Sequence, residues 1–195
     1  RGTADFFNGR NATGSAVDIP YNICFGRQSA RNGYSYAGFF AYTSTSTSYR
    51  EYLENQLSAP MVPGRRYLVS MYVSLSEFST IAIDNIGIAL RTSQTREVSF
   101  TNLPYTAQIV SPDNSFIRDK KAWVNISAVF IADQPYQYLI IGNFKHTALT
   151  DTIRVADTSA LLSGGTFSGC TSPNHMAYYF VDDVMVSEIN GAISG

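Results

Sequence analysis

The sequence has few of the residues that specialised sites commonly use. Among 195 residues there are two cysteines, two histidines and one tryptophan, and only 15% are charged. The 14 basic and 15 acidic residues leave a net charge of -1, so the chain lacks the basic surface that nucleic acid or an anionic membrane requires. No apolar run reaches the roughly 18 residues that span a bilayer. We therefore expect no nucleic-acid partner and no membrane insertion.

Catalytic motifs are missing as well. There is no G-x-S-x-G elbow, no G-x-G-x-x-G loop and no P-loop. A glycosidase needs two facing carboxylates, but the glutamates are scattered, and the odd spacing of Glu51 and Glu54 puts them on opposite faces of a strand. We expect a protein that is not an enzyme and has no catalytic residues. A cleft that gathers two carboxylates would overturn this expectation.

The two cysteines, Cys24 and Cys170, lie far apart in the chain and form no CxxC motif, which argues against zinc or thioredoxin chemistry. Two interpretations remain: a single long-range disulfide, or two buried thiols that act as small hydrophobic residues. The composition, rich in Ser and Thr and poor in Lys, favours an exported protein and hence the disulfide.

Residues that favour β-strands are abundant in the chain, which has 13 Tyr and 12 Phe. The clearest strand covers 69–76, where Val69, Met71, Val73 and Leu75 alternate with Ser70, Tyr72, Ser74 and Ser76, which predicts one buried and one solvated face. Similar alternation predicts strands near 34–42, 86–90, 124–130, 139–141 and 180–186. Segment 49–57 fits a short capped helix or a strand, and we favour the strand. We read 1–33 and 147–174 as loops, the second a long surface excursion.

The last predicted strand contains an unusual acidic residue. Side chains two residues apart in a strand point to the same face, which places Phe180, Val184 and Val186 together. Asp182 falls in the same alternation and is predicted to point to that face as well. An ionised carboxylate that points toward a core needs a partner, a metal or several hydrogen bonds, so Asp182 is a candidate site residue. Strands separated by turns, without helical segments between them, predict one all-β domain over 1–195, an antiparallel β-sandwich or jelly roll.

Several strings also carry a resemblance to a known family. They include Asn-Gly-Tyr-Ser-Tyr-Ala-Gly at 32–38, Tyr-Arg-Glu-Tyr-Leu at 49–53 and Tyr-Tyr-Phe-Val-Asp-Asp-Val at 178–184, and others lie at 20–22, 26–30, 64–75, 85–87, 123–127 and 138–144. Together they resemble the N-terminal domain of OmpA-family and gliding-associated cell-surface proteins of Gram-negative bacteria. That domain is similar to carbohydrate-binding modules of the family 4/9/22, galactose-binding-like type.

The resemblance implies a non-catalytic jelly roll on the cell surface, associated with the outer membrane or secreted, with a structural calcium ion. Its ligands would include Asp182, with Asp183 as a weaker candidate. Further oxygens would come from Gln28 and from Arg31, the latter through its carbonyl group, since calcium prefers six to eight oxygen ligands.

One part of the family pattern is absent from this chain. Relatives begin with a strand of the Asn-x-Ser-Phe-Glu type, whose Glu completes the calcium site, and this sequence starts after that point. Either processing removed the strand or another chain supplies it. A sandwich without its first strand exposes an unpaired edge, so we expect that the domain can assemble as a homo-oligomer or with a partner chain that donates a strand.

Ligand binding in such modules depends on aromatic rings that stack against sugars and on amides that orient them. The predicted outward parity favours Tyr72, Asn85 and Tyr179, although the tyrosines also fit a role that only covers the sheet. Two functions stay open at this point. One is a carbohydrate-binding or adhesion module whose partner is a glycan. The other is a structural subunit of a surface layer, fibre or envelope complex whose partner is a cell-envelope protein and which recognises no sugar.

Overall fold

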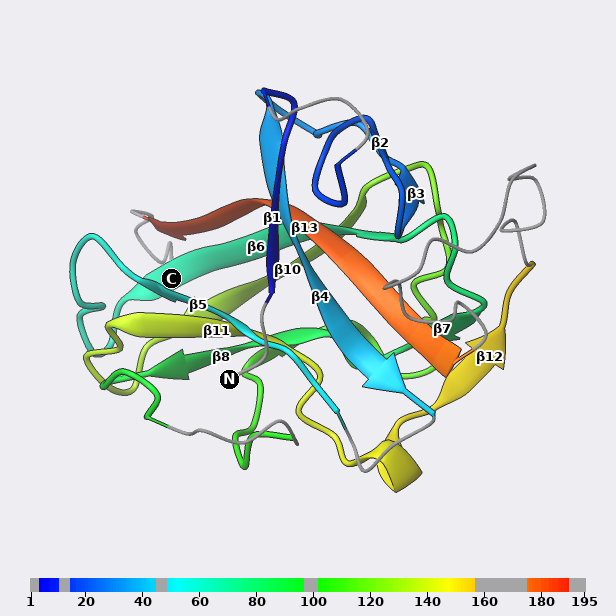
Figure 1. Ribbon diagram of the computed structural model, residues 1–195. Helices are drawn as coiled ribbons and strands as arrows, with labels where there is room; N and C mark the ends of the chain where they lie inside the picture. The colour runs from blue at the N-terminus through cyan, green and yellow to red at the C-terminus, as the bar shows by residue number, and fades with distance from the viewer. Residues whose placement is uncertain (1–3, 11–14, 45–48, 97–101, 157–174, 190–195) are drawn as a thin grey trace.

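The computed structural model describes residues 4–10, 15–44, 49–96, 102–156 and 175–189. Two antiparallel sheets pack against each other (Figure 1), so the prediction of an all-β antiparallel sandwich is confirmed. The larger sheet has the order β1 (Asp5–Asn8), β4 (Ser35–Thr43), β13 (Met176–Glu188), β6 (Arg66–Leu75), β10 (Val124–Ile131). The smaller has the order β5 (Leu53–Gln56), β11 (Tyr138–Gly142), β8 (Gly87–Arg91), β9 (Ile109–Val110).

The remaining elements are short. Strand β2 (Tyr21–Asn22) pairs with β3 (Gly26–Arg27), and β7 (Ile81–Ile83) pairs with β12 (Thr152–Arg154). A 3-10 turn, η1, covers Thr147–Leu149. In the described part of the chain, none of the helical segments has the length and apolar character needed to cross a membrane.

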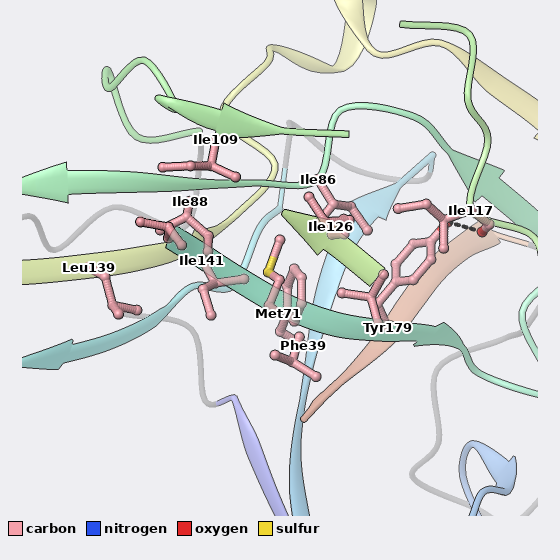
Figure 2. Close-up of a cluster of buried hydrophobic side chains, with 14 of the residues drawn as sticks. Phe39, Met71, Ile86, Ile88, Ile109, Ile117, Ile126, Leu139, Ile141 and Tyr179 are labelled. Carbon is pink, nitrogen blue, oxygen red and sulfur yellow. Dashed lines mark hydrogen bonds between the residues drawn. The ribbon is translucent and has the colours of Figure 1, made fainter. Parts of the chain in front are cut away.

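The main core lies between the two sheets. The inward residues of β6 behave as their alternation predicts, since Val69, Met71, Val73 and Leu75 are all fully buried. They pack against apolar side chains of the smaller sheet, which Figure 2 shows closing over them. These partners include Ile86, Ile88, Ile109, Leu139 and Ile141.

The opposite face of β6 is not the solvated face that we expected. Ser70 is 6% exposed, and Ser74 and Ser76 are fully buried. The Ser74 hydroxyl donates to the carbonyl of Asp119, which is distant in sequence, at 3.4 Å, whereas the hydroxyls of Ser76 and Ser79, three residues apart, hydrogen-bond each other at 3.2 Å. Strand alternation identifies a sheet face, but it does not reveal which loops fold back onto that face.

A second, aromatic cluster lies on the outer face of the larger sheet, which is the face turned away from the smaller sheet. Its buried members are Phe7, Phe25, Tyr36, Met176, Tyr178 and Phe180. The rings of Phe25 and Tyr178 stack with centroids 3.6 Å apart. Gly38 is needed beneath them, because a Cβ there would lie 2.6 Å from the Tyr178 ring and 2.7 Å from the Phe7 ring. Part of this sheet is therefore buried on both faces.

Strand β13 contains a β-bulge that changes which residues face the core. Its pairing with β6 shifts between Asp182 and Met185, and Asp183 has a φ of 48°. Before the bulge Phe180 joins the aromatic cluster, whereas after it Val186 packs against the main core and Val184 is 41% exposed. The expectation that Phe180, Val184 and Val186 share one face is therefore wrong, and Asp182 points away from the main core.

Both segments that we read as loops contain short strands. Within 1–33, β1 pairs with β4 along its whole length and β2 pairs with β3. Within 147–174, η1 and β12 occupy the first residues, and 157–174 lies outside the described residues. Cys170 falls there, so its predicted disulfide with Cys24 stays a prediction. In 49–57 the strand exists, but it is limited to β5.

Candidate functional site

Three polar residues form a row across the outer face of the larger sheet. Asp182 on β13 is the Cα partner of Tyr72 on β6, and Tyr72 is in turn the partner of Asn125 on β10. Side chains of directly paired residues point to the same face of a sheet. Two candidates from the sequence, Asp182 and Tyr72, are therefore neighbours, and Asn125 extends the row.

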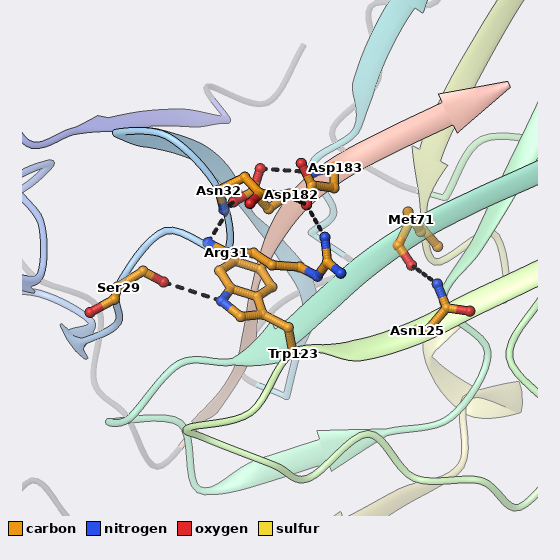
Figure 3. Close-up of polar contacts among 8 residues, drawn as sticks. All are labelled: Ser29, Arg31, Asn32, Met71, Trp123, Asn125, Asp182 and Asp183. Atoms are coloured by element: carbon orange, nitrogen blue, oxygen red, sulfur yellow. Dashed lines mark hydrogen bonds and ion pairs between the residues drawn. The ribbon is translucent and has the colours of Figure 1, made fainter.

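The loop that precedes β4 folds over this row. The guanidinium carbon of Arg31 lies 3.5 Å from the centroid of the Tyr72 ring, a cation–π stack. Arg31 also forms an ion pair with the carboxylate of Asp183. The Nδ2 atom of Asn32 donates to the same carboxylate at 2.6 Å. Figure 3 shows Arg31 and Asn32 converging on the two aspartates.

The Asp182 carboxylate holds this loop through backbone amides. Its Oδ2 accepts the N–H of Arg31 at 2.8 Å and that of Asn32 at 3.3 Å, and its Oδ1 accepts the N–H of Asp183 at 2.7 Å. Burial, followed by the negative charge of Asp182, raises the pKa of Tyr36 above its ordinary value. Asp182 thus positions the 31–32 backbone over the sheet.

Trp123 fixes the other side of the same loop. Its indole Nε1–H donates to the carbonyl of Ser29 at 3.1 Å, as drawn in Figure 3. The edge of its ring contacts Tyr36 with centroids 5.6 Å apart. Trp123 therefore holds the 29–32 loop through the Ser29 carbonyl, while Asp182 holds it through the amides of Arg31 and Asn32.

Next to the row the surface forms a hollow of about 460 Å³. Short hydrogen-bonding side chains and the stacked pair Arg31–Tyr72 line it. The polar lining residues are Arg31, Asn32, Ser70, Tyr72, Asn125, Ser127 and Asp183. Asn125 is already oriented, because its Nδ2 donates to the Met71 carbonyl at 3.4 Å and its Oδ1 accepts the Ser127 hydroxyl at 2.7 Å. The hollow thus offers donors, acceptors and a planar surface together.

The predicted calcium ligand Asp182 is surrounded by hydrogen-bond donors. Both of its oxygens accept N–H groups, and the Arg31 guanidinium brings positive charge to the neighbouring Asp183. Within the described ranges, no group of three or more His, Cys, Asp and Glu side chains converges as metal ligands would. The carbonyl of Gln28 accepts the Tyr36 hydroxyl at 3.1 Å, and its side chain donates to Lys121. Calcium stays a prediction.

Two of the predicted ligand-binding residues are not on the outer face. Tyr179 is fully buried in the main core, where its hydroxyl donates to the Ile117 carbonyl at 2.8 Å (Figure 2). Asn85 is 7% exposed and follows β7 with a φ of 43°, so it is part of a turn and not of a strand face. Neither side chain is available to a ligand on this surface, which corrects both expectations.

Four polar residues that line the hollow were not expected there from the sequence: Asn32, Ser70, Asn125 and Ser127. Asn125 and Ser127 were detectable, since they occupy the alternate positions of the 124–130 strand whose inward residues were identified. Asn32 had no comparable pattern, because it lies in a loop whose path is determined by the distant Asp182.

Comparisons with known proteins find distant structural neighbours. No family model matches the chain, and no curated protein matches it. Among solved structures, the CBM22-1 xylan-binding domain of Paenibacillus barcinonensis Xyn10C is 12% identical, with 98% of this chain and 85% of that one covered and a TM-score of 0.47. The K3 cleaved adhesin domain of Lys-gingipain from Porphyromonas gingivalis is 13% identical, with 96% and 93% covered and a TM-score of 0.40. A CBM4 structure is 14% identical, with 95% and 86% covered and a TM-score of 0.42.

Proposed function

We propose that this chain is a non-catalytic carbohydrate-binding or adhesion module that works outside the cell or on its surface. The observation that carries the proposal is the hollow beside Asp182, Tyr72 and Asn125. It combines a planar stacked pair with several amide, hydroxyl and carboxylate groups on a rigid sheet. Sugar recognition needs this combination, because a pyranose presents both an apolar face and a ring of hydroxyl groups.

The residues have distinct roles in this proposal. The exposed part of the Arg31–Tyr72 stack meets the apolar face of a sugar ring. Asn125, Ser127 and Asn32 exchange hydrogen bonds with its hydroxyls, each from a position already oriented by a neighbouring group. A proton-transfer role does not suit the two aspartates, since Asp182 accepts three N–H groups and Asp183 is paired with Arg31. The proposal requires no metal ion.

A glycan-binding experiment tests this function. The purified chain is screened on an array of plant and bacterial polysaccharides, and hits are measured by isothermal titration calorimetry. Tyr72→Ala and Asn125→Ala are each expected to weaken binding at least tenfold, which corresponds to about 1.4 kcal/mol. Tyr34→Ala is the matched control, because Tyr34 is 70% exposed and lies outside the hollow. Binding that survives both variants, or the absence of any glycan hit, would contradict the proposal.

The rival function, a structural subunit without sugar recognition, is favoured by a different observation. Phe6 on the edge strand β1 is 62% exposed, beside a large apolar groove. This groove lies beside β1 and β5, and Val184 lines both the groove and the polar hollow.

A further inference from the structure

Strand β1 has no opposing strand among those that the structure describes. Strand β10 contacts β9 across the sandwich. When the strands of the two sheets are matched in order from that end, β6 lies opposite β8, β13 opposite β11 and β4 opposite β5. The fifth strand of the larger sheet, β1, is left over. The smaller sheet is therefore one strand shorter at the side where β1 and β5 form the edges.

The register shows that Phe6 points into this gap. Phe6 is the Cα partner of Ala37, and Ala37 is the partner of Val181. Val181 belongs to the main core and is 3% exposed, so all three side chains lie on the inner face of the sheet. Phe7, on the opposite side of β1, is fully buried in the aromatic cluster. Phe6 is thus a core-facing residue with 62% of its surface exposed.

Strand β5 turns backbone groups toward the same gap, and no strand in the described part of the chain pairs with them. Leu57 donates its N–H to the Gln137 carbonyl, so alternation along an antiparallel ladder turns the backbone groups of Asn55 and Leu53 toward β11. The N–H and C=O groups of Glu54 and Gln56 then point outward. Among the described strands, none pairs with this side of β5. Such an edge accepts another strand readily.

Between β1 and β5 lies a groove of about 880 Å³. Its apolar lining comes from both sheets, and includes Phe6, Leu53, Leu57, Val181, Val184 and Val186. Val184 is 41% exposed because the bulge in β13 turns it away from the core. The groove is therefore bounded by apolar side chains on its walls and by backbone hydrogen-bonding groups along one rim.

We propose that this groove binds an extended segment of a different polypeptide, which adds to β5 as a fifth strand and lies opposite β1. A lipid or a sugar would not satisfy the regularly spaced N–H and C=O groups of Glu54 and Gln56, whereas a strand does so by backbone pairing. The segment carries apolar residues at alternate positions, which pack against Phe6 and Leu53. Since β5 has four residues, a segment of about four to eight residues is long enough.

A second copy of this chain does not fit the gap through its own β5. That strand reads Leu-Glu-Asn-Gln, and Leu53 is its only apolar residue. An edge-to-edge dimer of two β5 strands would satisfy the backbone but leave the apolar walls around Phe6 and Val184 largely open. The occupant is therefore a strand with more apolar side chains than β5 has. This inference does not depend on the proposed glycan binding, because Phe6 and the outward backbone groups of β5 lie outside the polar hollow, although Val184 lines both surfaces.

Fluorescence anisotropy with synthetic peptides tests the inference. The probe is a pool of labelled octapeptides in which Val, Ile, Leu or Phe alternates with Thr or Lys. The control pool has the same sequences with an N-methyl group on every backbone amide, which preserves the apolar side chains but removes the N–H groups that pair with an edge strand. We expect saturable binding of the first pool and at least tenfold weaker binding of the second. Equal binding of both pools, or of neither, would overturn strand addition.

Variants of the chain locate the binding. Phe6→Ser removes the exposed wall, and Gln56→Pro removes an outward N–H without disturbing the ladder to β11. Each is expected to weaken binding at least fivefold. Val129→Ser is the matched control, because Val129 is 50% exposed on β10, at the opposite edge of the same sheet. If Val129→Ser weakens binding as much as Phe6→Ser, the groove is not the site.

Two further measurements separate the remaining outcomes. Hydrogen exchange is expected to slow at the amides of Glu54 and Gln56 when peptide is added, and unchanged exchange there would contradict pairing with β5. Light scattering is expected to show a monomer without peptide. A dimer that Gln56→Pro abolishes would overturn the proposed occupant, because it would show that a second copy fills the edge.

Discussion

The hydroxyl of Tyr178 donates to Oδ2 of Asp5 at 2.6 Å, joining β13 to the edge strand β1. Tyr178 is fully buried and stacks on Phe25, whereas Asp5 is half-buried. Burial raises the pKa of the Asp5 carboxyl above its ordinary value, and the hydrogen bond from Tyr178 opposes this effect only in part. The attachment of β1 therefore depends on a carboxyl group whose protonated form is favoured more than in a free aspartate.

The first prediction concerns the pH dependence of stability. Because the pKa of Asp5 is higher in the folded state, its contribution to stability is fully present below the ordinary value of 3.8 and is lost as the pH rises through the folded pKa. Asp5→Asn keeps an acceptor for Tyr178 and cannot ionise. We expect the stability of wild type relative to Asp5→Asn to fall as the pH rises above the ordinary carboxyl value of 3.8 and through the raised pKa of the folded state. Urea unfolding over this range measures it, and a constant difference would contradict the prediction.

The second prediction concerns alkaline pH. Burial raises the pKa of Tyr52 to about 12, and raises those of Tyr36, Tyr178 and Tyr179 further. Stability from these phenols is present below their ordinary value of 10 and is lost as the pH rises above it, because only the unfolded chain ionises them readily. Absorbance at 295 nm should therefore rise in two phases. The second phase should coincide with loss of near-UV circular dichroism, and a single phase with a native spectrum would contradict this.

The third prediction distinguishes the core from the ligand surface. Tyr179→Phe removes the hydroxyl that donates to the Ile117 carbonyl and accepts the Ile83 N–H at 2.9 Å. Leaving these groups unpaired in the core should reduce the free energy of unfolding by about 1–3 kcal/mol. Chemical denaturation measures the change, with Tyr34→Phe as an exposed control. Any affinity for a glycan should be unaffected. A weakened affinity at unchanged stability would show instead that Tyr179 contributes to ligand binding.

The fourth prediction concerns metal removal. Since the oxygens of Asp182 already accept N–H groups from Arg31, Asn32 and Asp183, we expect EDTA to leave the melting temperature unchanged. Differential scanning fluorimetry with EDTA, and then with added calcium, measures this. A rise of several degrees with calcium, lost in Asp182→Asn, would show instead that the 31–32 backbone rearranges to bind the ion, as the family resemblance implies.

Much of the sandwich was predictable because apolar alternation has a direct physical cause. Val69, Met71 and Val73 repeat every second residue, and only a strand places such residues on one buried face. The burial of Ser70 and Ser74 was not predictable in this way, since it depends on loops whose positions are set by tertiary packing.

The candidate site was only partly predictable for a related reason. Tyr72 lies before any irregularity in its strand, so its parity was assigned correctly. Tyr179 and Asp182 were each assigned to the wrong side, because a bulge between Asp182 and Met185 changes the parity along β13. The sequence gives little indication of the bulge. Asp183 tolerates a positive φ better than most residues, but an aspartate alone does not identify one.

The same bulge allows one stretch of β13 to change during evolution while the rest of the strand keeps its position. Residues on either side of it keep their alignment with β6 through the pairs Val181 with Val73 and Val186 with Val69. The residues between them, including Asp183 and Val184, contribute to the polar hollow and to the apolar groove. Insertions or exchanges within this short stretch would alter both surfaces at once while the core alignment is preserved, so ligand preference and partner preference in such a domain would diversify together.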